Sequence, residues 1–93
     1  MTLGELLKIN RDVRGLSIRN AAIGIGISSG HLNDLEKGGI IHPKMICLHK
    51  IANFYEIPED DLCIIAERIP SDVFWKIIHC PELLGVIRKY KGA

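Results

Sequence analysis

Apolar residues recur at intervals of three and four along most of the chain, which is the spacing of one face of an α-helix. Thr2 and Glu5 form a capping-box pattern, so a first helix is expected from residue 3, and Gly15 is expected to end it. Ser17 is placed to cap a second helix, and Gly26 is placed to end it in a left-handed conformation. The apolar positions of these two helices are Leu3, Leu6, Leu7 and Val13, then Ile18, Ala21, Ala22 and Ile25.

Three further short helices follow from the same pattern. Ser28 is placed to cap the third helix, and the Gly38–Gly39 pair is expected to end it. After a loop through residues 40–42, Pro43 suits the first turn of a fourth helix, and Pro58 opens a fifth in the same manner. The expected buried positions are Leu32 and Leu35 in the third helix, then Leu48, Ile51, Ala52 and Tyr55 in the fourth.

The last quarter of the chain predicts two more helices. Ser71 and Asp72 are expected to cap a sixth helix, and the Cys80–Pro81 pair interrupts it, because proline disfavours helical geometry at the residue before it. Pro81 then opens a final helix. The sequence shows no strand-type alternation, internal repeat or low-complexity tract, so we predict an all-α protein of about seven short helices.

Composition bounds the size and charge of the protein. A chain of 93 residues with 47% apolar residues has the length of one domain and enough apolar material for a core without metal or disulfide support. The net charge is only +1, which is low for a nucleic-acid-binding protein. Residues 1–44 carry six basic and four acidic residues, whereas residues 45–93 carry six and seven, so the small basic excess lies in the first half.

The cysteines and the N-terminus favour the cytoplasm. Cys47, Cys63 and Cys80 lie among aliphatic residues, where we expect each thiol to behave as a small buried hydrophobic group. Their odd number and wide spacing do not suggest a disulfide framework. The start of the chain does not resemble a signal peptide, and no apolar run is long enough to span a membrane. We therefore expect a soluble, cytoplasmic protein with no membrane partner.

The stretch from Leu16 to Gly38 has the residue types of two short helices that meet at a tight turn. Ala22 is small where the helices would cross, Gly26 permits the turn, and Ile27 fills the space between the helices. The second helix would then project its N-terminal polar residues outward, which is the arrangement needed to enter the major groove of DNA.

This stretch resembles the helix-turn-helix of the phage Cro and repressor proteins, whose wider bacterial membership is the Xre family. The resemblance continues through Glu36-Lys37-Gly38, Pro43 and the residues 48–52, and it ends with Ile57 and Leu62. It implies a five-helix, lambda-repressor-like DNA-binding domain over residues 1–66. Residues 67–93 would then form a C-terminal two-helix extension, which we expect to act as a dimerisation element.

The resemblance also implies roles for individual residues. The recognition helix corresponds to residues 28–37, with Asn33 suited to adenine and Asp34 to the amino group of cytosine. Arg11 and Glu36 match positions that often pair internally, so Arg11 is not expected to contact DNA. The implied DNA-binding residues are Ser17, Arg19, Ser28, Ser29, Gly30, His31, Asn33, Asp34, Lys37 and Lys44.

His31 admits two roles, and Ile18 and Gly30 reduce the number of polar side chains that can contact DNA. For His31, a phosphate contact and an exposed bystander role are equally compatible with the sequence. Ile18 stands where phage repressors often have an amide side chain, and Gly30 offers no side chain. We therefore expect DNA shape to contribute to recognition beside direct base contacts.

The apolar residues of the extension over residues 67–93, called the tail below, admit two interpretations. They either cover the five-helix core or pair two copies of the chain, and we favour pairing because helix-turn-helix proteins usually bind two half-sites about 34 Å apart. The predicted dimer interface consists of Phe74, Ile77, Ile78, Leu83, Leu84, Ile87 and Tyr90.

These features predict a sequence-specific regulator of transcription, a repressor that binds a palindromic operator in double-stranded DNA as a homodimer. The alternative is an antitoxin or other protein-interaction module that uses the apolar tail on a protein partner. Gly24–Gly30 lacks the preceding strand of a nucleotide loop, and no nucleophile and base stand out, so we expect no enzyme and no cofactor. We expect no metal site, because no cysteine has ligand spacing to the four histidines, His31, His42, His49 and His79.

Overall fold

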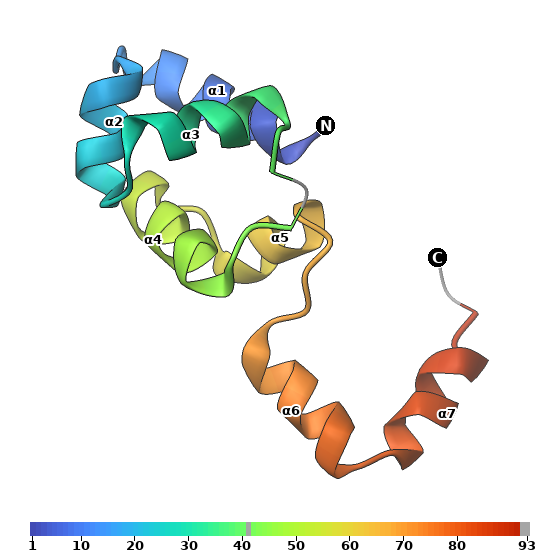
Figure 1. Cartoon of the computed structure of the whole chain (residues 1–93). Coiled ribbons are helices and arrows are strands. Elements are labelled where there is room, and N and C mark those ends of the chain that lie inside the picture. The colour runs from blue at the N-terminus through green and yellow to red at the C-terminus, as the bar shows by residue number, and fades with distance from the viewer. Residues whose placement is uncertain (41, 92–93) are drawn as a thin grey trace.

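The computed structural model describes residues 1–40 and 42–91, and over these residues it contains seven helices and no strand (Figure 1). This confirms the predicted all-α class. Ile41, in the predicted loop, and the last two residues of the predicted extension lie outside the described residues. The helices are α1 (Leu3–Val13), α2 (Ile18–Ile25), α3 (Ser29–Lys37), α4 (Met45–Tyr55), α5 (Glu59–Ile65), α6 (Ser71–His79) and α7 (Glu82–Lys89).

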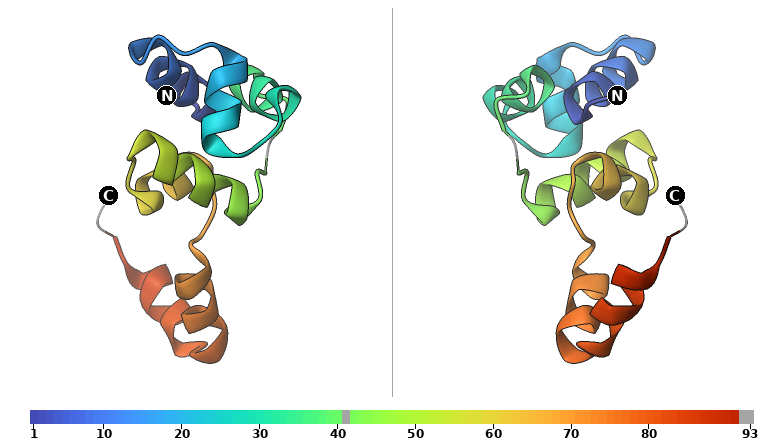
Figure 2. Two further views of the ribbon diagram at one scale, coloured as in Figure 1. Left: turned by 90° about the vertical axis from the view of Figure 1, so that its left-hand side faces the viewer. Right: turned by 90° about the vertical axis from the view of Figure 1, so that its right-hand side faces the viewer.

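Helices α1 to α5 enclose one apolar core. Helices α1 and α2 both pack on α3, α2 also packs on α4, and α4 packs on α5 (Figures 1 and 2). The predicted inward residues of α3 and α4 are all buried, as are residues of α1, α2 and α5. The most deeply buried apolar side chains are Leu7, Ala21, Ala22, Leu32, Leu35, Leu48, Ile51, Tyr55, Leu62 and Cys63.

Local hydrogen bonds confirm the predicted ends of the first three helices. The hydroxyl groups of Thr2, Ser17 and Ser28 accept hydrogen bonds from the backbone amides three residues later, at 3.0 to 3.1 Å. Gly26 and Gly38 close α2 and α3 in left-handed conformations, with φ of 94° and 78°. These ends depend on residues within one turn of the helix, which is why the sequence pattern predicts them.

Two predicted helix starts are displaced. Helix α4 begins at Met45 rather than at Pro43, because Lys44 is extended with ψ of 148° and Pro43 is buried ahead of it. Helix α6 is capped by neither Ser71 nor Asp72. Pro70 is the last extended residue, so Ser71 already lies inside the first turn, where its hydroxyl is not positioned as a cap.

Three other residues differ from simple expectations. Glu56 and Glu67 adopt left-handed conformations, with φ of 56° and 57°, although such helix ends usually carry glycine. Val13, predicted among the apolar positions of α1, is 78% exposed, so it lies off the buried face that carries Gly4 and Leu7.

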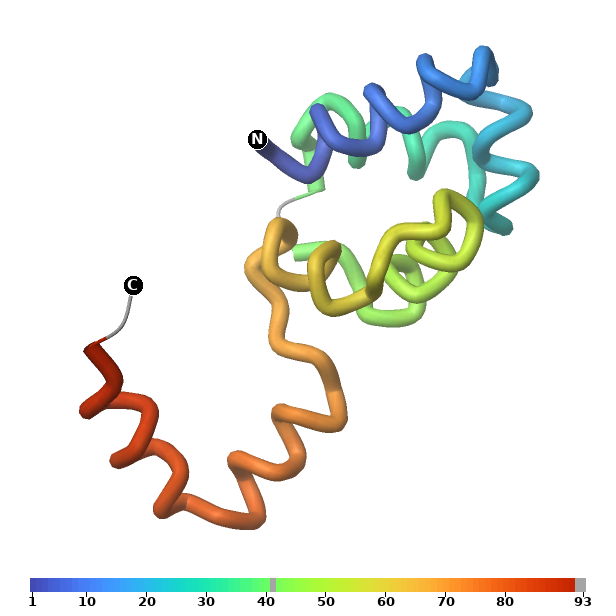
Figure 3. The backbone as a smooth tube through the Cα atoms, turned by 180° about the vertical axis from the view of Figure 1, so that it is seen from behind, coloured from blue at the N-terminus to red at the C-terminus, as the bar shows by residue number. Residues whose placement is uncertain are grey.

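Helices α6 and α7 project from the rest of the molecule as an open V (Figures 1 and 3). Neither helix contains a buried residue, so they do not cover the core. The radius of gyration is 15.3 Å, whereas a compact chain of this length has about 12 Å. The prediction of three buried cysteines is wrong for Cys80, which is exposed at the end of α6. Among the helices described here, none has the length and hydropathy of a membrane span.

Candidate nucleic-acid interface

Helices α2 and α3 form a helix-turn-helix around Gly26. The backbone amides of Gly26 and Ile27 both donate to the carbonyl oxygen of Ala22, at 2.8 and 3.0 Å. The left-handed φ of Gly26 reverses the chain, and Ser28 caps α3 two residues later. Ala22 is almost fully buried, and Ile27 packs against the core, as the sequence predicts. Gly24, in α2, has the ring of Phe54 in the space where a Cβ atom would lie.

An internal ion pair holds α3 against α1. The guanidinium of Arg11 donates from Nε and Nη2 to the two carboxylate oxygens of Glu36, at 2.8 and 3.0 Å. Arg11 Nη1 donates to the carbonyl of Leu16 at 3.0 Å. The hydrogen bond to Glu36 raises the pKa of Arg11. Both side chains are mostly enclosed, so Arg11 is committed to the scaffold, as expected.

Helices α1 and α3 also approach each other closely at Gly4. A Cβ atom added there would overlap the backbone carbonyl of Glu36. Gly4 is therefore a packing residue, and it sets the distance between the two helices together with the Arg11–Glu36 pair. The opposite side of α3 is left facing outward by this arrangement.

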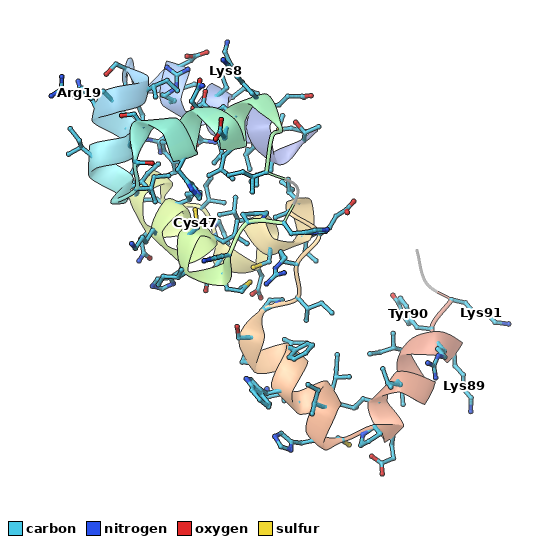
Figure 4. The ribbon with its side chains drawn as sticks, in the orientation of Figure 1. Lys8, Arg19, Cys47, Lys89, Tyr90 and Lys91 are labelled. Carbon is cyan, nitrogen blue, oxygen red and sulfur yellow. The ribbon has the colours of Figure 1, made fainter. Side chains whose placement is uncertain are left out.

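The predicted DNA-binding residues lie mainly on that outward side and at nearby helix ends. Asn33 is half-buried, and Gly30 has open space where a Cβ atom would be. The exposed members of the set are Ser17, Arg19, Ser28, Ser29, Gly30, Asp34, Lys37 and Lys44. Arg19 points away from the first turn of α2 into solvent (Figure 4). Whether these residues contact DNA stays a prediction.

The basic residues of α1 and its C-cap Arg14 contact other groups of the protein. Lys8 pairs with Asp12 at 3.4 Å, and Arg14 donates to the carbonyl of Tyr55 at 2.9 Å. Arg14 also lies over the Tyr55 ring, with 5.0 Å between the guanidinium carbon and the ring centroid. Within the described part of the chain, the ion pairs do not include the cations predicted to contact phosphates, Arg19, Lys37 and Lys44.

His31 does not lie on the outward face. It is half-buried, and its Nε2 lies 3.5 Å from Sγ of Cys47 on α4. Burial raises the pKa of the Cys47 thiol, with a smaller opposing effect of Lys50. The side chain of His31 is therefore directed toward α4, which corrects the outward placement expected from its position in α3.

Lys50 is a potential contact residue that sequence reasoning missed. Its ammonium group donates to the carbonyl of Gly26 at 3.3 Å, so it reaches from α4 to the turn of the helix-turn-helix. A cavity of about 260 Å³ adjoins it, lined by Ile27, Ser28, His31, Lys44, Ile46, Cys47 and Lys50. No acidic residue lines this cavity. The only indication in the sequence is that a second lysine follows Lys44 on the same predicted helix. The sequence does not indicate that the Lys50 side chain extends to the turn at Gly26.

Comparisons with protein-family models, with curated proteins and with solved structures give no match for this chain. Across residues 1–40 and 42–91, no three histidine, cysteine or acidic side chains gather in an arrangement that could hold a metal ion.

Proposed function

We propose that the chain is a sequence-specific regulator of transcription that binds double-stranded DNA, and that α1 to α5 form a lambda-repressor-like DNA-binding domain. One observation carries the proposal. Ser29, Gly30 and Asp34 of α3 are exposed beside the turn of the helix-turn-helix, while Arg11 and Glu36 hold the helix to α1. A helix presented in this way can enter the major groove with its first residues against the bases.

The residues around α3 divide into two groups of proposed contacts. Ser29, Asn33 and Asp34 would face base edges, and Gly30 would allow close approach of the helix backbone. The amides at the starts of α2 and α3, with the caps Ser17 and Ser28, would face phosphates. The cations that would neutralise those phosphates are Arg19, Lys37, Lys44 and Lys50.

We further propose that the protein acts as a homodimeric repressor through α6 and α7. The described chain exposes 6497 Å², whereas a compact protein of 10.4 kDa exposes about 5,400 Å². The excess, roughly 1,100 Å², is somewhat more than the roughly 800 Å² that each partner buries in a standard interface. Two copies joined in this way would present two α3 helices to a palindromic operator.

Selection from a pool of random-sequence duplexes at low salt tests DNA recognition directly. We expect the folded full-length chain to enrich one palindromic sequence. Failure to enrich any sequence would contradict the proposal. Asp34→Ala should change the preferred bases, because a contact to a base edge carries sequence information.

Lys44→Met and Lys50→Met should act differently from Asp34→Ala. Each should weaken binding to all duplexes by a similar factor and reduce the slope of log affinity against log salt by about 1. Lys76→Met, on α6, is the matched control and should leave the slope unchanged. If Lys44→Met and Lys50→Met have the same salt slope as Lys76→Met and the parent chain, Lys44 and Lys50 do not contact the DNA.

Gly30→Ala separates folding from recognition. Nothing lies within 4 Å of the added methyl group in the free protein, so the variant should fold at least as well as the parent. If the backbone of α3 approaches DNA closely at Gly30, the methyl group should lower operator affinity about tenfold. An unchanged affinity would show that Gly30 provides no close approach.

The exposed tail supports a second candidate, an antitoxin or other protein-interaction module. The V of α6 and α7 leaves apolar side chains open to solvent, and these would equally suit a different protein. Light scattering of the full chain distinguishes the two candidates. A dimer at micromolar concentration supports the homodimer, and a monomer with this surface still exposed favours a heterologous partner.

A further inference from the structure

A cavity lies where the connector between α5 and α6 meets the start of α4. Its volume is about 460 Å³, within the range of small-molecule sites. Two segments contribute to it: the first residue of α4, and a continuous run from the connector through the first turn and a half of α6. The lining residues are Met45, Glu67, Arg68, Ile69, Ser71, Phe74 and Trp75.

One wall of the cavity is aromatic. Phe74 and Trp75 lie edge to face, with ring centroids 6.3 Å apart, and Trp75 stacks on His79 at 5.7 Å. The stacking on His79 limits the positions open to the indole. Met45 is a flexible apolar side chain that adapts to the shape of what it contacts. These groups suit a planar or branched apolar body.

The cavity is also lined by a cation, Arg68. Arg68 is half-buried, and its Nε is fully enclosed without a hydrogen-bond partner among the described residues. Because Nε is closed to solvent, only the rest of the Arg68 side chain is open to a ligand in the cavity, and its positive charge acts there. Glu67 also lines the cavity, but it is exposed, so water screens its carboxylate.

The start of α6 adds further donors at the same place. No side chain caps this nine-residue helix, and Ser71 lines the cavity from its first turn. Asp72, also in the first turn, does not line it. The free amides of a helix N-terminus favour negative charge, as does Arg68. The donors and the aromatic wall thus adjoin one cavity.

We propose that this cavity binds a small organic anion with an aromatic or branched apolar body. The charged group lies between Arg68 and the start of α6, and the body lies against Met45, Phe74 and Trp75. Met45 directly follows Lys44, so the ligand bridges the start of α4 and the tail. If the chain binds DNA as proposed above, occupancy of the cavity regulates operator affinity; this regulatory role rests on the proposed function, and the binding itself does not.

The single tryptophan, Trp75, allows a direct test on the full-length chain. The dye 1-anilinonaphthalene-8-sulfonate and its neutral parent N-phenyl-1-naphthylamine share an apolar body and differ only in the sulfonate. We expect the sulfonate to bind one per chain, to accept excitation energy from Trp75, and to bind about tenfold more tightly than the neutral parent, since a charge-assisted hydrogen bond favours it.

Arg68→Met should abolish the preference for the sulfonate while leaving the neutral dye unaffected. Lys76→Met is the matched control, because Lys76 is a cation of α6 that does not line the cavity. Equal binding of both dyes by the parent chain, or an unchanged preference in Arg68→Met, overturns the proposal. So does the absence of energy transfer. The proposal assigns Phe74 to the cavity, which leaves Ile77, Ile78 and the apolar residues of α7 to pair two copies of the chain.

Ser71→Phe gives an independent test if Arg68→Met does not fold. Ser71 is exposed, so a larger side chain there should fill the cavity without disturbing the core, and both dyes should bind at least fivefold more weakly. Unchanged dye binding overturns the proposal.

A gel-shift titration on the selected operator, with and without the sulfonate dye, tests regulation. We expect the dye to change the operator affinity of the parent chain at least threefold and to leave that of Ser71→Phe unchanged. If the chain prefers the sulfonate dye but binds no operator, the proposed function is contradicted and the ligand site is not.

Discussion

The two parts of this chain use similar sequences in opposite ways. Apolar residues recur at helical spacing both in α1 to α5 and in α6 and α7, and both parts fold into helices. The buried core residues all lie between Leu7 and Ala66, whereas the tail buries none. Helical periodicity therefore indicates that a face needs to be covered, but it does not indicate what covers it.

Truncation of one aliphatic side chain in each part should give the largest contrast. Leu48 is fully buried, so Leu48→Ala should lower the free energy of unfolding by about 2–5 kcal/mol. Ile87 is 55% exposed, so Ile87→Ala should change it by less than about 0.5 kcal/mol at concentrations where the chain is monomeric. Urea denaturation measures both. Similar losses for the two variants would mean that the tail has a packed core of its own.

The Arg11–Glu36 pair gives the next largest expected effect. Glu36→Ala leaves the mostly enclosed guanidinium without its carboxylate, which should destabilise the protein by about 3 kcal/mol. Arg11 also lies 3.8 Å from Asp12, whose side chain is half-exposed, so Asp12→Asn is the control and should change stability by less than about 1 kcal/mol. Equal thermal melting shifts in both variants would contradict the structural role of Glu36.

Glycines in the two parts should respond with opposite signs. Gly4→Ala places a methyl group against the backbone of α3 and should destabilise the protein by about 1–3 kcal/mol. Gly85 has open space around it in α7, so Gly85→Ala should stabilise that helix by about 0.5–1 kcal/mol. Thermal melts report the first effect, and amide exchange in α7 reports the second. A stabilising Gly4→Ala would contradict the close approach of α1 and α3.

Alkaline pH should weaken the first part by a smaller amount. Burial raises the pKa of the Cys47 and Cys63 thiols above their ordinary value of 9.0, and it raises the pKa of Tyr55. The native state therefore keeps protons that the unfolded state loses, so stability is full below pH 9 and falls as the pH rises above 9. The loss is about 1.4 kcal/mol for each unit of pKa difference.

Urea midpoints between pH 8 and 10 measure this loss. Cys63→Ala should flatten the profile, because it removes one of the buried thiols. Cys80→Ala, in the exposed turn of the tail, should leave the profile as it is in the parent. A profile that depends on Cys80 and not on Cys63 would contradict the assignment of the effect to the core.

The sequence predicts the features that depend on neighbouring residues. Caps at Ser17 and Ser28 and the left-handed Gly26 each act within a single turn, so their residue types indicate them. At the left-handed Glu56 and Glu67 the backbone amides of the next residues, Ile57 and Arg68, donate back to carbonyls of α4 and α5. No local preference of glutamate indicates these ends. Predicted helix ends are accordingly most accurate where a side chain supplies the cap.

The candidate interface shows the same division. Exposed positions of α3 such as Ser29 and Asp34 follow from the helical spacing of Leu32 and Leu35. The direction of His31 toward Cys47 and the reach of Lys50 to Gly26 depend on how α4 lies beside α3. Contacts between segments distant in the chain, such as these, are outside what spacing alone can predict.

The exposure of Cys80 has a practical consequence. Because Cys47 and Cys63 are enclosed, the chain presents one accessible thiol, at the bend between α6 and α7. A maleimide spin label can therefore be attached at the tip of the V in the unsubstituted protein. In a twofold assembly the two labels would define one interlabel distance, so pulsed electron resonance could follow the arrangement of the tails in solution.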